Sequence, residues 1–303
     1  MQSQHIVNNR ILGQLSADEL KSVQPWLTPL ELRSNVVLHE PGDAMERVYF
    51  PLSGMISLLA VMQSGEAIET GIVGADGLVG GDAAINGHAF GQMTVQQDGA
   101  ALTMPRAKFV DAYLAHPHLR NLVDRYQAIL LTQAQQNAAC HALHSVRSRL
   151  CRWLLQSQDM IGSDTFSLTQ EFLSHMLGVQ RNTVSIEAHA VQQAGLIRYS
   201  RGYITILNRD GLEDCACECY SVIRAETDKM MGPAKSQSEP EIRQLVIGKT
   251  AFVLLLGRPG LKFRCHFPQP PSDPEIKGGP RHGNKNFRLL TQVCTADHDH
   301  SLG

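Results

Sequence analysis

The chain has few charged and aromatic residues and no long apolar run. Charged residues make up 18% of its 303 residues and aromatic residues 6%, whereas hydrophobic residues reach 43%. This composition is typical of a soluble globular protein and excludes fibrous and disordered classes. The longest apolar candidate, residues 245–256, is interrupted by Lys249 and falls short of the roughly 18 residues that a membrane-spanning helix needs. The opening MQSQHIVNNR lacks a signal-peptide pattern, so we expect a cytoplasmic protein without a membrane partner.

Cysteine is neither frequent nor even in number. The seven cysteines favour a reducing compartment over a disulfide framework. Their densest group is DCACECY at residues 214–220, which lacks the two-residue spacing of common zinc ligands; on a helix Cys215 and Cys219 would share a face and Cys217 would point elsewhere. We therefore predict no metal site, with redox sensing by these thiols as an alternative. Scattered histidines are likewise predicted to be solvated or locally hydrogen-bonded, namely His88, His141 and His144.

Charge is distributed unevenly, although the net charge is only −2. Residues 1–143 contain eight Lys/Arg and thirteen Asp/Glu, residues 144–209 contain seven Arg and four acids, and the remainder is balanced. An acidic first half followed by a basic middle indicates that the two parts have different functions, and the basic part is suited to binding a polyanion. The length favours two folded units with additional segments.

The first hundred residues alternate short apolar segments with turn residues. Ser16 can cap a first helix, because Glu19 stands at the capping-box position. Six segments then have strand composition, at residues 36–40, 47–52, 54–62, 67–73, 91–97 and 100–105. Regularly spaced short strands with turns between them predict an antiparallel barrel or jelly roll. We expect this β-roll domain to occupy residues 1–117.

Residues 118–144 contain neither glycine nor proline and carry a heptad pattern. The pattern forms what we call the heptad seam, which consists of Leu119, Leu122, Tyr126, Ile129, Gln133, Gln136, Cys140 and Leu143. Two interpretations are compatible with it: a helix packed on its own domain, and a parallel coiled-coil contact in a homodimer. Both can hold if a second stripe of Val123, Leu130 and Ala134 faces the roll. We expect the heptad seam to form the dimer interface.

Two further helices and a glycine turn lie in the basic middle of the chain. One helix is predicted to begin at Val146 and end at Gly162, and the next to be capped by Thr169 and to end at Gly178. The following run, residues 180–194, is amphipathic, with apolar residues such as Val184 on one face. Two helices joined by a short glycine turn predict a helix-turn-helix whose second helix can enter a DNA major groove.

The second helix and the segment after it carry the candidate DNA-binding residues. A helix N-terminus attracts phosphate, and Arg181 can donate two parallel hydrogen bonds to guanine. Residues 196–207 alternate apolar and polar residues around Ser200-Arg201-Gly202, which predicts a hairpin wing with arginines beside the DNA backbone. The predicted DNA-binding residues are Gln180, Arg181, Asn182, Thr183, Ser185, His189, Arg198 and Arg201.

Residues 9–231 resemble the Crp/Fnr family of bacterial transcription regulators. The resemblance rests on LHEPGDAMERVYFPLSG, the long helix, SLTQEFLSHMLGVQRNTVS and QAGLIRYSRGYITILN, in that order. It implies an α+β chain with a β-roll sensor domain, a dimerisation helix over residues 118–144 and a winged helix-turn-helix over residues 145–231. It also implies a homodimer that binds a two-fold symmetric double-stranded DNA operator, with RNA polymerase as a further partner. Arg181 matches the family's first base-reading arginine, whereas Asn182 and Ile186 replace a glutamate and a second arginine, so the operator sequence stays open.

The cassette that binds a cyclic nucleotide in some family members is incomplete in this chain. The corresponding positions, our candidate effector pocket, are Gly80, Gly81, Asp82, Gln92 and Met93. No arginine lies between Arg47 and Arg106, and a buried phosphate without a cationic partner is strongly disfavoured. We therefore do not expect cyclic AMP; another metabolite or no effector are the alternatives. Iron–sulfur relatives use N-terminal cysteines, whereas the first cysteine here is Cys140, so no cofactor is predicted.

The last part of the chain lies outside the resemblance. Residues 232–303 contain eight of the fourteen prolines, which predicts a mostly disordered extension with a marginal element near residues 245–256. No paired carboxylates or Ser/His/Asp order indicates an enzyme. The competing function is a signalling module whose roll binds a nucleotide or another metabolite and whose winged helix contacts protein.

Overall fold

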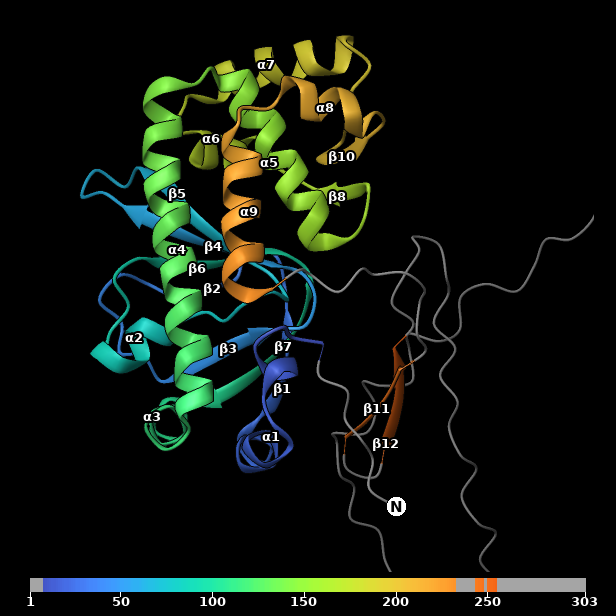
Figure 1. The fold of residues 1–303 in the computed structure, drawn as a ribbon. Helices are drawn as coiled ribbons and strands as arrows, with labels where there is room; N and C mark the ends of the chain where they lie inside the picture. Colours follow the sequence, from blue (N-terminus) through green and yellow to red (C-terminus); the bar gives the residue numbers. More distant parts are fainter. Residues whose placement is uncertain (1–7, 233–242, 248–249, 255–303) are drawn as a thin grey trace, which may run out of the picture. The chain divides into compact units, whose positions relative to one another are not determined.

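The computed structural model describes residues 8–232, 243–247 and 250–254, and Figure 1 shows their arrangement. The N-terminal part begins with the 3-10 turn η1 (Leu12–Gln14), helix α1 (Ala17–Val23) and the 3-10 turn η2 (Gln24–Trp26). The Ser16 side chain accepts a hydrogen bond from the Glu19 N–H, and the Glu19 carboxylate accepts one from the Ser16 N–H. The predicted capping box is confirmed.

Two antiparallel sheets form the β-roll. The first has the order β1-β7-β3, from β1 (Thr28–Leu32), β7 (Gly99–Pro105) and β3 (Arg47–Pro51). The second has the order β2-β6-β4-β5, from β2 (Val37–His39), β6 (Gln92–Gln97), β4 (Met55–Val61) and β5 (Ala67–Val73). All six predicted strands are present. The sequence did not predict β1, which contains Pro29; as an edge strand it tolerates the missing N–H.

Three helices complete this domain: α2 (Gly81–Asn86), α3 (Arg106–Ala115) and the long α4 (Pro117–Leu143). Helix α4 packs against the roll through the heptad seam. Leu119, Leu122, Tyr126 and Ile129 are at most 2% exposed and belong to the same apolar core as Phe50. The fold class, an antiparallel roll followed by a long helix and a helix-turn-helix, is confirmed.

From Leu119 to Cys140 the heptad seam is covered by its own chain, so these side chains do not form the predicted dimer contact, whereas Leu143 at its end is 79% exposed. Below the apolar positions, Gln133 Oε1 accepts a hydrogen bond from the Ile72 N–H at 3.2 Å. Gln136 donates to the Cys219 sulfur at 3.1 Å, and Cys140 is fully buried. The roll and helix α9 (Cys219–Met231) thus cover these side chains, and of the two interpretations a helix packed on its own domain holds for them.

A different stripe of α4 faces outward in the described chain. Positions spaced by three and four residues on this face are all exposed, and we call them the outer stripe: Asn121, Asp124, Ala128, Leu131, Gln135, Ala138 and Ala142. Leu131, at the middle of this 27-residue helix, is 59% exposed. Helix α4 therefore carries two heptad stripes, and among the described residues the heptad seam is the one that is covered.

The second domain has the connectivity of a winged helix-turn-helix. Its elements are α5 (Val146–Ile161), β8 (Thr165–Ser167), α6 (Gln170–Leu177), α7 (Arg181–Gln193), β9 (Ile197–Ser200) and β10 (Tyr203–Ile206). The strands form a sheet of order β8-β10-β9. Gly162 and Gly178 end α5 and α6 in the left-handed conformation, and Thr169 caps α6, as the sequence predicts.

The chain then returns to the first domain. After α8 (Arg209–Cys215), helix α9 (Cys219–Met231) runs beside α4 (Figure 1). Met231 enters the core of the roll, and Asp228 forms an ion pair with Arg10 at 3.6 Å. Helix α9 therefore fastens the end of the second domain to the long helix and the roll.

The predicted disordered extension lies almost entirely outside the described residues. Within it the structure describes one antiparallel pair, β11 (Arg243–Ile247) and β12 (Thr250–Leu254). None of the helices in the described ranges has the length and apolar character needed to cross a bilayer.

Candidate DNA-binding surface, sensor domain and domain junction

Helix α7 is the second helix of the helix-turn-helix and lies at the surface of the second domain (Figure 1). Val184, Ala188 and Val191 are at most 2% exposed and pack into the core of the second domain, which also contains Trp153 and Leu173. On the opposite face, Asn182, Ile186 and His189 are exposed among the described residues. The apolar stripe that the sequence predicts is thus what turns the polar face of α7 toward solvent.

The predicted DNA-binding side chains are on this free face and on the wing. Gln180 is the N-cap residue, and its side chain makes no capping hydrogen bond. Thr183 and Ser185 are half-buried, and the remaining predicted residues are exposed, namely Gln180, Arg181, Asn182, His189, Arg198 and Arg201. Ile186, at 66% exposure, lies among them as an apolar group available for contact.

Two ion pairs hold the charged groups around α7. The Arg181 guanidinium lies 2.6 Å from Glu171 on α6, and both side chains are 60% exposed. Arg147 on α5 lies 2.9 Å from Glu187. Exposed pairs of this kind contribute about 0–1 kcal/mol, so Arg181 can exchange its carboxylate partner for another acceptor at little cost.

The wing is the hairpin of β9 and β10. The turn uses Arg201 and Gly202, both in the left-handed region, with φ of 51° and 80°. A non-glycine residue in this conformation is uncommon. It places the Arg201 side chain at the tip of the wing, and Arg198 is exposed on β9. The two arginines are thus presented on the same hairpin, as predicted.

The residues of the candidate effector pocket mostly contact other parts of the roll and helix α4. Gly80 packs against the Met45 sulfur, and a side chain at Gly81 would meet Gln127 from α4. Gln92 donates a hydrogen bond to the Glu40 carboxylate at 2.9 Å, and Met93 is buried in the core of the roll. Asp82 is exposed. Arg106 reaches the same region and donates from Nε to the Ala84 carbonyl on α2 at 2.6 Å.

A buried carboxylate that the sequence analysis did not identify lies between the two domains. Glu69 on β5 is 5% exposed. Its Oε1 accepts a hydrogen bond from the Trp153 indole on α5 at 3.1 Å, and its Oε2 accepts one from Ser57 at 2.8 Å. Burial raises the pKa of Glu69 to about 7, against the opposing effects of Ser57, Arg152 and Trp153. The contact between roll and helix-turn-helix therefore contains a group that titrates near neutrality.

The end of α4 and the loop between α8 and α9 bring four ligand-type side chains together. The sulfur atoms of Cys140, Cys217 and Cys219 and a ring nitrogen of His144 all lie within 4.8 Å of one another. The thiol of Cys140 lies 3.5 Å from that of Cys217, and its hydrogen bond lowers the pKa of Cys217 to about 5. Cys215 ends α8 and packs with the second domain's core instead.

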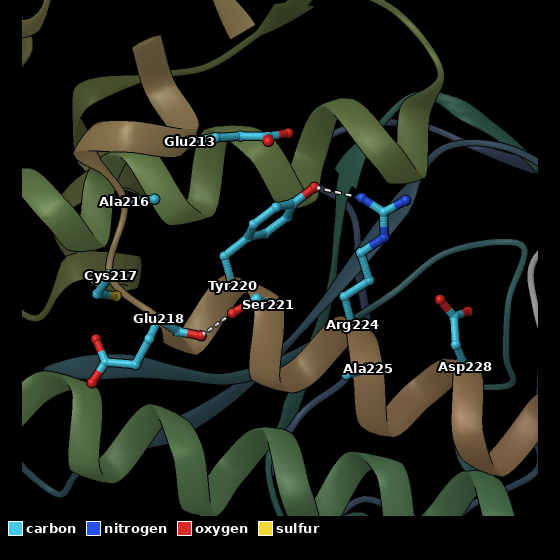
Figure 2. Close-up of a pocket in the computed structure, with 9 residues that line it drawn as sticks. All are labelled: Glu213, Ala216, Cys217, Glu218, Tyr220, Ser221, Arg224, Ala225 and Asp228. Atoms are coloured by element: carbon cyan, nitrogen blue, oxygen red, sulfur yellow. Dashed lines mark hydrogen bonds between the residues drawn. The ribbon is translucent and has the colours of Figure 1, made fainter. Parts of the chain in front are cut away.

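This cluster corrects the sequence interpretation of DCACECY. The segment is not one helix: α8 ends at Cys215 and α9 begins at Cys219. Cys217 and Cys219 therefore point the same way, and Cys140 and His144 reach them from one end of α4. The four-residue spacing of Cys140 and His144 is the feature of the sequence that could have indicated this cluster. Beside the cluster, an open pocket of about 530 Å³ is lined by Cys217, Glu218, Tyr220 and Arg224 among others (Figure 2).

Comparisons with known proteins agree with this architecture. Residues 29–116 match the cyclic nucleotide-binding domain and residues 148–215 the Crp-like helix-turn-helix domain. No curated protein sequence matches the chain. Among solved structures, FixK2 from Bradyrhizobium japonicum is 14% identical with a TM-score of 0.55, covering 63% of this chain and 98% of its own. A transcriptional regulator of the Crp/Fnr family from Eubacterium rectale is 17% identical, with a TM-score of 0.55 and coverages of 68% and 96%. The c-di-GMP responsive regulator CLP from Xanthomonas campestris is 13% identical, with a TM-score of 0.54 and coverages of 63% and 99%.

Proposed function

We propose that this chain, which combines a cyclic nucleotide-binding domain fold with a Crp-like helix-turn-helix domain, is a sequence-specific DNA-binding transcription regulator of the Crp/Fnr family. The observation that carries the proposal is the exposed polar face of α7, which begins at Gln180 and has Arg181 in its first turn. The first N–H groups of a helix have no partner within it and favour phosphate, while side chains of the first turn reach base edges.

The wing supports the same proposal. Arg198 and Arg201 are exposed on one hairpin, where contacts to backbone phosphates add affinity that falls with salt and carries no sequence information. Arg181 supplies discrimination, because a bidentate contact to guanine contributes about 1–3 kcal/mol. The two kinds of contact are separable by experiment.

The regulator acts as a homodimer in this proposal, and the outer stripe of α4 is the surface that joins two copies. The outer stripe has the period of a coiled-coil contact and is exposed throughout, with Leu131 at its centre. Two-fold pairing would present two α7 helices to successive major grooves about 34 Å apart. RNA polymerase is the further partner of the assembly.

The roll is the sensing part of the proposed regulator. It contacts the DNA-binding domain through Glu69 and Trp153, so a ligand of the roll could bias the position of α7. Such a ligand must bind the two arrangements unequally, or it would shift neither. We expect its chemistry to differ from that of a cyclic phosphate, because Gln92 stands where the resemblance implies an arginine and donates its amide N–H to Glu40.

Binding to DNA is tested with operators selected from genomic fragments by the purified full-length chain. Arg181→Ala should reduce the preference for the selected site over unrelated DNA by about 10- to 100-fold per half-site, since the base contact is lost. Nonspecific binding should change little. Arg33→Ala is a matched control, because Arg33 is also an exposed arginine in a surface ion pair, at 2.9 Å from Glu31. An equal loss on all DNA sequences would contradict the assignment of Arg181 to base reading.

A further inference from the structure

Four potential metal ligands converge at the point where the two domains join. Cys140 and His144 lie one helical turn apart at the end of α4, and Cys217 and Cys219 flank Glu218 at the start of α9. Two of the ligand-atom separations are 3.5 Å, from Cys140 to Cys217 and from Cys219 to His144 Nδ1. No pair of the four atoms is farther apart than 4.8 Å.

These separations suit a single tetrahedral ion. With Zn–S bonds of about 2.3 Å and Zn–N bonds of about 2.0–2.1 Å, neighbouring ligand atoms lie about 3.5–3.8 Å apart. The observed range of 3.5 to 4.8 Å therefore needs side-chain shifts of about 1 Å at most. Three sulfur atoms and one imidazole form a soft ligand set that selects zinc among the common divalent ions.

We propose that Cys140, His144, Cys217 and Cys219 bind one zinc ion per chain. In the bound state all three sulfur atoms are thiolates, so the thiol protons still present are released to solvent, and the imidazole is neutral with Nδ1 on the metal. Four protein ligands fill the tetrahedron, so the site has no open position for a substrate and is structural. The proposal stands independently of DNA binding.

Surrounding groups are arranged as the outer partners of such a site would be. His144 Nε2 lies 3.2 Å from the Glu218 carboxylate, which fixes the ring with Nδ1 toward Cys219. Gln136 donates its amide N–H to the Cys219 sulfur at 3.1 Å. Histidine ligands of zinc commonly donate their second N–H to a carboxylate in this way, and that partner orients the ring.

The charge of the site also has a partner. Three thiolates and a neutral imidazole around Zn²⁺ carry a net charge of −1, and the buried Arg152 lies near Cys140 and Cys217 as well as near Glu69. A buried arginine needs a nearby negative group. Without the ion, Cys140, Cys217 and Cys219 form an isolated cluster of buried thiols separate from the two apolar cores.

An approach for the ion exists. The open pocket beside the cluster includes Cys217 in its lining, together with acidic residues Glu213, Glu218 and Asp228 (Figure 2). Cys140 and Cys219 are fully buried behind it, and the His144 side chain is 23% exposed. A hydrated cation can thus reach Cys217 from solvent before the remaining ligands replace its water.

The position of the site suggests what the ion does. His144 is the single residue at the end of α4 before Ser145 caps α5, and Cys217 lies between α8 and α9. One ion would therefore tie the long helix, the entry to the helix-turn-helix and its exit together. Removing it should loosen the orientation of the second domain relative to the roll.

The test measures metal content by mass spectrometry on the full-length chain purified from zinc-supplemented cells. We expect about one zinc per chain in the unchanged protein, as for a closed four-ligand site. Cys140→Ser and Cys217→Ser should lose most of it. Cys215→Ser and Cys151→Ser are matched controls, because both thiols belong to the second domain's core and lie outside the cluster, and they should retain the ion.

A second measurement does not depend on whether the variants fold. Cobalt(II) added to the metal-free unchanged chain should give the intense visible absorption of tetrahedral thiolate coordination, and zinc should abolish it. Unchanged zinc content in Cys217→Ser would overturn the proposal. So would an unchanged chain that contains no zinc and gives no cobalt spectrum, a chain that contains iron and labile sulfide, or one with a Cys140–Cys217 disulfide.

Discussion

Replacing Glu69 by glutamine should remove a pH dependence of stability that this one carboxyl creates. Glu69 has a pKa of about 7 in the folded chain against an ordinary 4.5, because burial between Ser57 and Trp153 disfavours its charged form. The folded state therefore binds the proton more tightly than the unfolded state. By linkage, the stabilisation is complete below pH 4.5 and is lost as the pH rises to about 7.

The size of the effect follows from the difference in pKa. About 2.5 pKa units at 1.36 kcal/mol each give roughly 3 kcal/mol, most of it lost between pH 5 and pH 7. Glutamine has the shape of the protonated acid and can still accept from the Trp153 indole. Chemical denaturation of both proteins from pH 5 to pH 8 should show similar stabilities at pH 5 and a Glu69→Gln chain that is more stable by about 2–3 kcal/mol at pH 8. Parallel pH profiles would refute the reasoning.

Three further changes test other parts of the structure. Leu131→Glu should place charge in the outer stripe and weaken the proposed dimer by about 100-fold or more, as measured by light scattering across a concentration series. The control is Leu114→Glu on α3, where the leucine is 65% exposed, and it should leave the dimer intact. A Leu131→Glu chain that remains dimeric would reject the outer stripe as the interface. Gly77→Ala should lower the free energy of unfolding by about 3 kcal/mol, because the added Cβ would overlap the buried Tyr126 ring. Denaturant unfolding measures this, and adding Tyr126→Leu should restore part of the lost stability. An unchanged unfolding midpoint would show that the Tyr126 ring can move aside. Glu218→Gln should weaken zinc binding by about 10- to 100-fold while keeping one ion per chain at saturation. Competition with a chelator measures the zinc affinity. An unchanged affinity would mean that the Glu218 carboxylate does not orient His144.

The strands and helices could be predicted because the information is local. Glycine and polar turns separate the strands of the roll, and the cap residues Ser16 and Thr169 begin helices where expected. The placement of α7 followed from three apolar positions that fix which face is buried, with Val184 first among them. Local periodicity was sufficient wherever one stripe of a helix is apolar and the other polar.

The assignment of partners to helix α4 could not be predicted in the same way. The heptad seam and the outer stripe have the same period, and period alone does not say which stripe faces the roll. Leu119 and Tyr126 proved to be covered by the roll, whereas Leu131 is not. The Cys/His cluster was missed for a related reason: Cys140 and Cys217 are separated by 77 positions in the chain, and only the return of α9 along α4 brings them within 3.5 Å.

Because α9 ends at the roll, the stretch of residues 8–232 begins and ends at neighbouring places. Arg10, near its beginning, pairs with Asp228, three residues before the end of the last packed helix, so both extremities of this body are anchored at one place. A label, or a linker to a solid surface, attached at either end of this stretch would lie beside the roll and away from α7. A circular permutant could likewise join the two extremities with a short linker and be opened in an exposed turn elsewhere.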